Sequence, residues 1–194
     1  MPAFSPSLLS GTTLRTARHL LGKTLVCRTR SGTLSGIIVE TEAYLRNDPA
    51  SHSFRGRTRR NDVMFGPPGR LYVYFTYGMH HCINVVTQRE GIGEAVLIRA
   101  VEPSRGVAVM KRRRGWNRGM PVESLTNGPA KLAQAFGLTL AQNGADLRRG
   151  HVTIEEGVPV PDRLVGRSGR IGIRVATEKR WRFYVQGNPF VSRT

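Results

Sequence analysis

The alternation of apolar and polar residues along the chain predicts short strands and a few helices. Helices are expected where apolar residues recur every three or four positions between start and stop signals, at Leu14–Leu21, Arg105–Arg113 and Pro129–Phe136. Eight runs have the composition of strands: Thr24–Arg28, Leu34–Ala43, Arg70–Tyr77, Cys82–Gln88, Ala95–Val101, His151–Glu155, Gly169–Val175 and Arg182–Gln186. Because helices do not follow strands regularly, the pattern indicates an α+β fold with an antiparallel sheet.

A long polar stretch, from Leu45 to Gly69, interrupts this pattern. It is basic, rich in glycine and proline, and contains His52 and the basic run Arg55–Arg60. Loops of this length are uncommon in compact domains unless they have a function or are disordered.

Charge is the strongest compositional signal. The 194 residues, a length that fits one domain over residues 1–194, include 30 lysines and arginines but only 13 acids, for a net charge of +17. Such a surface attracts polyanions, and nucleic acid is the commonest one. A solvated basic face and an anionic membrane surface are the alternatives.

The remaining composition favours a protein of the cytoplasm that is not secreted. Two cysteines are too few for a disulfide framework, and the first residues lack the apolar segment of an export signal. No apolar stretch is long enough to span a bilayer, so no membrane association is expected.

Two acids close together on one expected strand are the first candidates for chemistry. In a regular strand Glu40 and Glu42 lie on one face, opposite Val39 and Thr41. In a chain with so few acids, this pair suggests a carboxylate held near a cleft. The alternative is that both acids face solvent and pair with nearby arginines.

Tyrosines on the next strand are the second candidates. Tyr72 and Tyr74 share a face and could simply pack in the core. Tyr77 stands where a turn begins, next to Gly78 and Met79, and a large aromatic there is exposed unless something covers it. In so basic a protein, nucleic-acid bases could provide that cover, since aromatic wedges unstack duplex DNA.

The histidines and cysteines do not predict a metal site. His80 and His81 are adjacent, so on a strand they point to opposite faces and make a poor ligand pair. No motif of a serine hydrolase or zinc protease occurs either. We therefore expect neither a metal nor another cofactor.

Taken in order, the unusual segments resemble the alkyladenine (3-methyladenine) DNA glycosylase family. The matching segments are Val39–Tyr44, His52-Ser53, Met64-Phe65, Pro68-Gly69, Leu71–Tyr74, Tyr77–Met79, Asn84, Leu97–Pro103, Gly128–Leu132 and Arg182–Val185. The resemblance runs from about Leu14 to Ser192. It implies a single domain with a curved antiparallel sheet flanked by helices, and a β-hairpin that inserts into DNA.

The resemblance also implies roles for individual residues. Glu42 is similar to the general base that activates water, with Arg99 and the backbone carbonyl near Ile171 completing the water site. The walls of the pocket for an extruded base are expected at Tyr44, His52 and Tyr74, and Asn84 resembles the residue that rejects normal guanine.

The remaining implied roles concern the DNA. Tyr77 resembles the wedge that fills the gap in the duplex, Met64 lies on the adjoining minor-groove element, and Lys131 resembles a phosphate contact. Arg57 and Arg60, in the basic run, should also neutralise phosphates.

The activity implied is monofunctional excision of alkylated purines, such as 3-methyladenine and 7-methylguanine and, as an open possibility, hypoxanthine or ethenoadenine. Its product is an abasic site, because the segments around Glu42 and Tyr74 hold no lysine for a strand-cleaving step. Duplex DNA with damaged purines is the expected partner of a monomer. His80-His81 and a shortened Asn47–Ser51 segment depart from vertebrate members, which leaves the range of lesions open.

Two other functions stay open. A non-catalytic DNA-binding protein that inserts Tyr77 would explain the charge but gives Glu42 no role. An RNA-binding protein with exposed strand aromatics would lack the usual signature of RNA-recognition sheets.

Overall fold

The computed structural model describes residues 9 and 11–192, which form one curled antiparallel sheet and three α-helices. The strands are β1 Thr24–Thr29, β2 Gly32–Tyr44, β3 Leu71–Thr76, β4 His80–Val86, β5 Ala95–Arg105, β6 Val152–Glu155, β7 Val165–Ser168 and β8 Arg182–Val185. The helices are α1 Thr13–Leu20, α2 Val107–Arg113 and α3 Pro129–Phe136, with short 3₁₀ turns η2 Asp62–Phe65, η3 Val122–Leu125, η4 Leu140–Gln142 and η5 Asp162–Leu164. The expected α+β class is confirmed.

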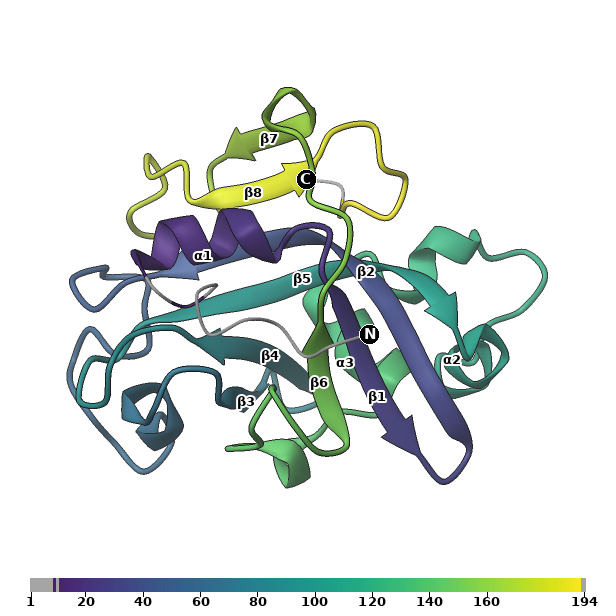
Figure 1. The fold of residues 1–194 in the computed structure, drawn as a ribbon, viewed down its shortest axis with the longest axis horizontal. Coiled ribbons are helices and arrows are strands. Elements are labelled where there is room, and N and C mark those ends of the chain that lie inside the picture. The colour runs from purple at the N-terminus through teal and green to yellow at the C-terminus, as the bar shows by residue number, and fades with distance from the viewer. Residues whose placement is uncertain (1–8, 10, 193–194) are drawn as a thin grey trace.

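The long strand β2 is the centre of the sheet. The strand order is β3-β4-β5-β2-β1-β6, and β8 adds to β2 with β7 beyond it. Figure 1 shows β2 and β5 crossing the middle of the molecule, with β7 and β8 beyond one edge and β3 and β4 beyond the other.

Strand β2 changes partners half-way along. Its first half, to Ile37, pairs with β1, whereas Glu40–Glu42 pair with β8, and β5 pairs along its other edge from Ser35 to Tyr44. The register with β5 is displaced at Glu40 and is regained at Thr41, so a bulge marks the branch point. Bulges increase local twist, which helps the sheet curl here.

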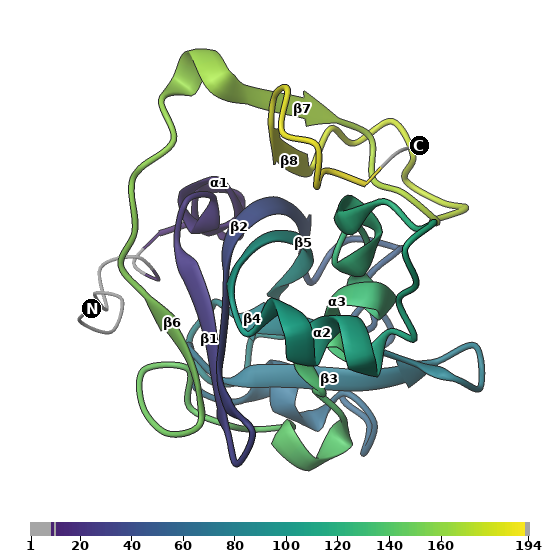
Figure 2. The ribbon, with the colours of Figure 1, turned by 90° about the vertical axis from the view of Figure 1, so that its right-hand side faces the viewer.

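Helices α2 and α3 fill the concave side of the curl. Figure 2 shows them in the angle between β1, β2 and β5 on one side and β3 on the other. Pro129 opens α3 and Gly137, at φ 68°, ends it in the left-handed conformation that glycine adopts without strain. The helix buries Leu132 and Phe136 completely within the main apolar core.

Most expected elements are present, with shifted ends. Helix α2 begins at Val107 rather than Arg105 because β5 continues through Arg105. The long segment before β3 is packed by its own hydrogen bonds: buried Asn61 donates to the carbonyls of His52 and Gly56. It is therefore an ordered loop.

One expected strand is wrong. The run Gly169–Val175 is irregular, and the strand in this region is β7, four residues earlier. Gly172 turns the chain at φ 77°, and the amide of Ile171 donates to the Glu42 side chain instead of to a neighbouring strand.

None of the helices within residues 9 and 11–192 has the length and apolar character needed to cross a bilayer.

Replacing Phe136 with alanine should destabilise the protein by about 3–5 kcal/mol, since a fully buried ring leaves a cavity that the sheet cannot close. Urea denaturation followed by circular dichroism measures the loss. Leu140→Ala, at a leucine that is 52% exposed, is the control and should cost under about 1 kcal/mol. Equal costs for both substitutions would contradict the core position of α3.

Candidate active site

The Glu42 carboxylate is the centre of the candidate site. It is completely buried, and both of its oxygens accept hydrogen bonds. Oε2 accepts from the Tyr44 hydroxyl at 2.8 Å, and Oε1 accepts from the backbone N–H of Ile171 at 2.7 Å. The Arg99 guanidinium, on β5, places Nη1 3.3 Å from Oε1. The contact of Ile171 with Glu42 is made by its amide, and the expected contribution of the backbone carbonyl near Ile171 to the water site stays a prediction.

Burial raises the pKa of Glu42 above the ordinary value of 4.5. The positive charge of Arg99, the Ile171 amide and the Tyr44 hydroxyl each lower this pKa, because they favour the ionised form. The neighbouring Glu40 raises it. The balance is a carboxyl group with a raised pKa that is still surrounded by donors suited to its ionised form.

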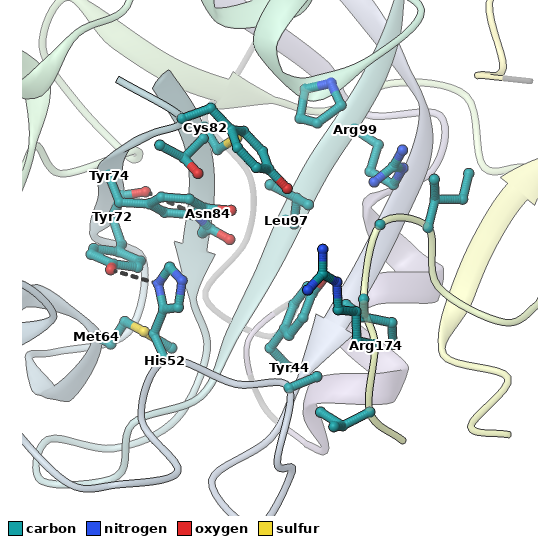
Figure 3. Close-up of a pocket in the computed structure, with 18 residues that line it drawn as sticks. Tyr44, His52, Met64, Tyr72, Tyr74, Cys82, Asn84, Leu97, Arg99 and Arg174 are labelled. Atoms are coloured by element: carbon teal, nitrogen blue, oxygen red, sulfur yellow. Dashed lines mark hydrogen bonds between the residues drawn. The ribbon is translucent and has the colours of Figure 1, made fainter. Parts of the chain in front are cut away.

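A cavity of about 440 Å³ lies beside this carboxylate, and its size is in the range of small-molecule pockets. Glu42 itself does not line the cavity, but its three partners Tyr44, Arg99 and Ile171 do. The carboxylate therefore lies directly behind the wall. Figure 3 shows Tyr44 and Arg174 on one side of the cavity and a cluster of aromatic rings on the other.

The aromatic cluster consists of His52, Tyr72 and Tyr74. The Tyr72 hydroxyl lies 3.0 Å from His52 Nδ1, and the His52 and Tyr74 rings meet edge to face with centroids 4.5 Å apart. Burial raises the pKa of Tyr72 to about 12 and also raises that of Tyr74. Burial, helped by the positive charge of Arg60, lowers the pKa of His52, so its ring is neutral near pH 7.

Asn84 and Met64 also line the cavity. The Asn84 amide donates to the Tyr72 carbonyl at 3.2 Å, which fixes its orientation. Met64 is only 2% exposed and packs with Tyr72, because the apolar face of η2 turns inward. The Met64 side chain forms part of the cavity wall, and its expected contact with DNA, on the element adjoining the minor groove, stays a prediction.

The β3–β4 hairpin carries an exposed aromatic side chain at its tip. Tyr77 is 81% exposed and Met79 is 70% exposed. Both central residues of the turn, Tyr77 and Gly78, have positive φ, as in a type I′ turn, and the Met79 amide closes it onto Thr76. A tyrosine in this conformation costs about 1–2 kcal/mol, so the fold maintains a strained aromatic at its surface.

The expected phosphate-binding residues already have partners within the protein. Arg57 pairs with Asp62 at 2.6 Å on the surface, and Arg60 donates to the Phe75 carbonyl at 3.1 Å. Lys131, in the first turn of α3, donates to Asn127 at 2.8 Å, and burial together with Arg114 lowers its pKa. Their contacts with DNA stay predictions.

Sequence reasoning missed a buried pair that supports Tyr44. Arg170 is paired with Asp48, donates to the Ala43 carbonyl at 3.0 Å, and lies 4.7 Å from the Tyr44 ring centre. Neither Asp48 nor Arg170 stands in a recognisable motif. In the sequence, Arg170 is distinguished only by its place within the run Gly169–Val175. Asp48 is distinguished only by the scarcity of acids in the chain.

No group of three potential metal ligands comes together in the part of the chain that the structure describes.

Comparison with known proteins agrees with the geometry of this site. The sequence profile of the methylpurine-DNA glycosylase family matches residues 7–189. The chain belongs to this family. It is therefore a DNA glycosylase, an enzyme that hydrolyses N-glycosidic bonds.

Curated relatives match this glycosylase along almost its whole length. A protein of Carboxydothermus hydrogenoformans named "Putative 3-methyladenine DNA glycosylase" is 49% identical over 91% of this chain and 92% of its own. Proteins of the same name from Methanoculleus marisnigri and Chlorobaculum tepidum are 48% and 46% identical, over 93% and 94% of this chain and 94% and 87% of their own.

Replacing Tyr44 with phenylalanine should raise the pKa of Glu42 further, because the ionised carboxylate loses a donor. NMR titration of the glycosylase labelled with ¹³C-glutamate measures this, with the Glu42 signal assigned by its absence in Glu42→Gln. Tyr72→Phe, which removes a hydroxyl from the same cavity, is the control and should leave the Glu42 titration unchanged. A fall in the Glu42 pKa in Tyr44→Phe would contradict the assigned contact.

Proposed function

We propose that this glycosylase acts as a single domain that draws an alkylated purine out of duplex DNA into the cavity and releases the base by hydrolysis, leaving an abasic site. One observation carries the proposal. The buried Glu42 carboxylate is held by Tyr44, Arg99 and Ile171 directly behind the wall of a cavity lined with tyrosines.

Glu42 is proposed as the general base. Cleavage of the glycosidic bond develops positive charge on the sugar, so a carboxylate can both deprotonate a water and stabilise that charge. A carboxylate has about four acceptor positions. Oε1 is engaged by Ile171 and Arg99, whereas Oε2 accepts only from Tyr44 and retains a position for water.

The aromatic cluster is proposed to hold the extruded base. Purines such as 3-methyladenine and 7-methylguanine carry a positive ring, and aromatic faces attract electron-poor cations. The lowered pKa of His52 is consistent with this role, since a neutral imidazole does not repel such a base. Asn84, at the cavity wall, is proposed to exclude normal guanine by clashing with the exocyclic amino group of that base.

Tyr77 is proposed to fill the space that the base leaves. The strained, exposed ring at the β3–β4 tip is already in position, and a wedge of this kind keeps a duplex open. Arg57, Arg60 and Lys131 are proposed to contact phosphates, and a monomer is sufficient for this geometry.

Replacing Glu42 with glutamine should lower single-turnover release of 3-methyladenine from methylated duplex DNA by about 10²–10⁴-fold. The amide has the same shape but cannot take a proton. Affinity for the duplex, measured by fluorescence anisotropy, should change little. Glu102→Gln, at a carboxylate elsewhere in the sheet, is the control and should retain activity. If Glu42→Gln released 3-methyladenine at the wild-type rate, the general base would have to be another group.

Replacing Tyr77 with asparagine should separate activity from stability. Asparagine tolerates the left-handed conformation, so the free energy of unfolding should rise by about 1 kcal/mol. Excision from duplex DNA should nevertheless fall by about 5–150-fold, as expected for the loss of a stacking contact of about 1–3 kcal/mol.

The effect of Tyr77→Asn on single-stranded DNA should be smaller, since no gap needs filling there. Val158→Ser, at another side chain that is 82% exposed, is the control and should excise normally. Equal losses on single and double strands would contradict the wedge.

A further inference from the structure

We infer that Glu40 is a positioning residue for this reaction: it orients the Arg99 guanidinium toward Glu42 and sets the charge balance under which Glu42 is ionised. This inference rests on the proposed role of Glu42 as the base. Glu40 lies two residues before Glu42, at the bulge where β2 changes partners.

Among the described residues, Glu40 is the carboxylate that accepts the most hydrogen bonds. It is completely buried, and its Oε1 accepts from Arg99 Nε at 2.9 Å, Arg182 Nε at 2.6 Å and Ser192 Oγ at 2.7 Å. Its Oε2 accepts from the Ser192 amide at 2.7 Å. Arginine, hydroxyl and backbone-amide donors thus surround both oxygens of Glu40.

These contacts determine where Arg99 points. The guanidinium is a rigid planar fork, so fixing Nε on Glu40 also fixes the direction of its two terminal nitrogens. One of them, Nη1, reaches Glu42 at 3.3 Å, and the other, Nη2, donates to Ser192 Oγ at 3.3 Å. Arg99, which lines the cavity, therefore bridges the two carboxylates.

The buried charges balance only when Glu42 is ionised. Two arginines, Arg99 and Arg182, then face two carboxylates, whereas protonation of Glu42 leaves one uncompensated positive charge. An isolated charge is costly in such a buried place. The cluster thus opposes the protonation that burial alone would favour.

The other titratable groups near Glu42 do not alter this balance. Tyr44 and Cys82 both have pKa values raised chiefly by burial, so both are neutral near pH 7. Arg170 lies against the ring of Tyr44 and has its own carboxylate partner in Asp48.

Charge and shape at position 40 can be separated by substitution. Glu40→Gln keeps an oxygen for Arg99 and Arg182 but removes the negative charge, so Arg99 becomes fully available to Glu42, whose pKa should fall. Glu40→Asp keeps the charge but withdraws the carboxylate from its partners by about one bond length. Arg182→Gln removes a positive charge from the far side of Glu40, so the pKa of Glu42 should rise.

The experiment is the pH profile of single-turnover base release from methylated duplex DNA. In DNA both 3-methyladenine and 7-methylguanine are already cationic on the acid side of the profile, so the substrate does not titrate across the acid limb, and spontaneous release is subtracted at each pH. The acid limb should move to lower pH by about half a unit to one unit in Glu40→Gln, and to higher pH by a similar amount in Arg182→Gln.

Two variants separate this effect from a general loss of structure. Glu40→Asp should keep the wild-type acid limb while its plateau rate falls by about 10–100-fold, because Arg99 is misplaced. Glu102→Gln removes a partly buried carboxylate that binds Asn188, in the same C-terminal region as Ser192, and should change neither limb nor plateau.

The inference is overturned if the limbs of Glu40→Gln and Arg182→Gln stay in place or move in the same direction. If Glu40→Gln does not fold, as judged by circular dichroism, Arg182→Gln decides: an upward shift supports the inference and an unmoved limb overturns it. An inactive Glu42→Gln together with unmoved limbs defeats this inference alone. An active Glu42→Gln defeats the proposed function itself.

Discussion

Burying two carboxylates side by side is the constraint on which this structure depends. An ionised group without water needs hydrogen-bond donors on every side, and no single element of the fold can supply them all. For Glu40 and Glu42 the donors come from β5, from β8, from the segment after β7 and from Ser192. The branch of the sheet at β2 makes this possible, because it brings β5 and β8 to opposite edges of one strand.

The same constraint explains how the cavity wall is supported. Tyr44 donates to Glu42 through its hydroxyl and is supported from behind by Arg170, itself tied to Asp48 and to the Ala43 carbonyl. The wall is thus held by ionic and hydrogen-bonded contacts rather than by apolar packing alone. On the opposite side, Tyr72 belongs to a separate small apolar cluster with Met64.

Sequence reasoning reached the antiparallel sheet, the three helices and the cavity residues Tyr44, His52, Tyr74 and Asn84, because alternation and motif order are local signals. It failed at Gly169–Val175 for an instructive reason. Ile171, Ile173 and Val175 do alternate, but the whole segment 171–175 lines the cavity and Val175 is exposed, so the alternation does not arise from a sheet. Period two in a short segment predicts a strand only where a neighbouring strand pairs with it. The hydrogen-bond partners of Glu40 could not be predicted from the sequence either, since Arg182 and Ser192 follow 142 and 152 residues later.

The distance along the chain between these partners has a consequence for biosynthesis. A ribosome completes β2 long before it reaches Ile171, which follows Glu42 by 129 residues, and Ser192 comes later still. Until then the two carboxylates lack the donors of the distant segments, so their burial is unfavourable and they remain hydrated. The cluster around the two carboxylates can assemble only after Ser192 has been synthesised, so a shorter nascent chain already carries most of the positive charge but lacks this arrangement.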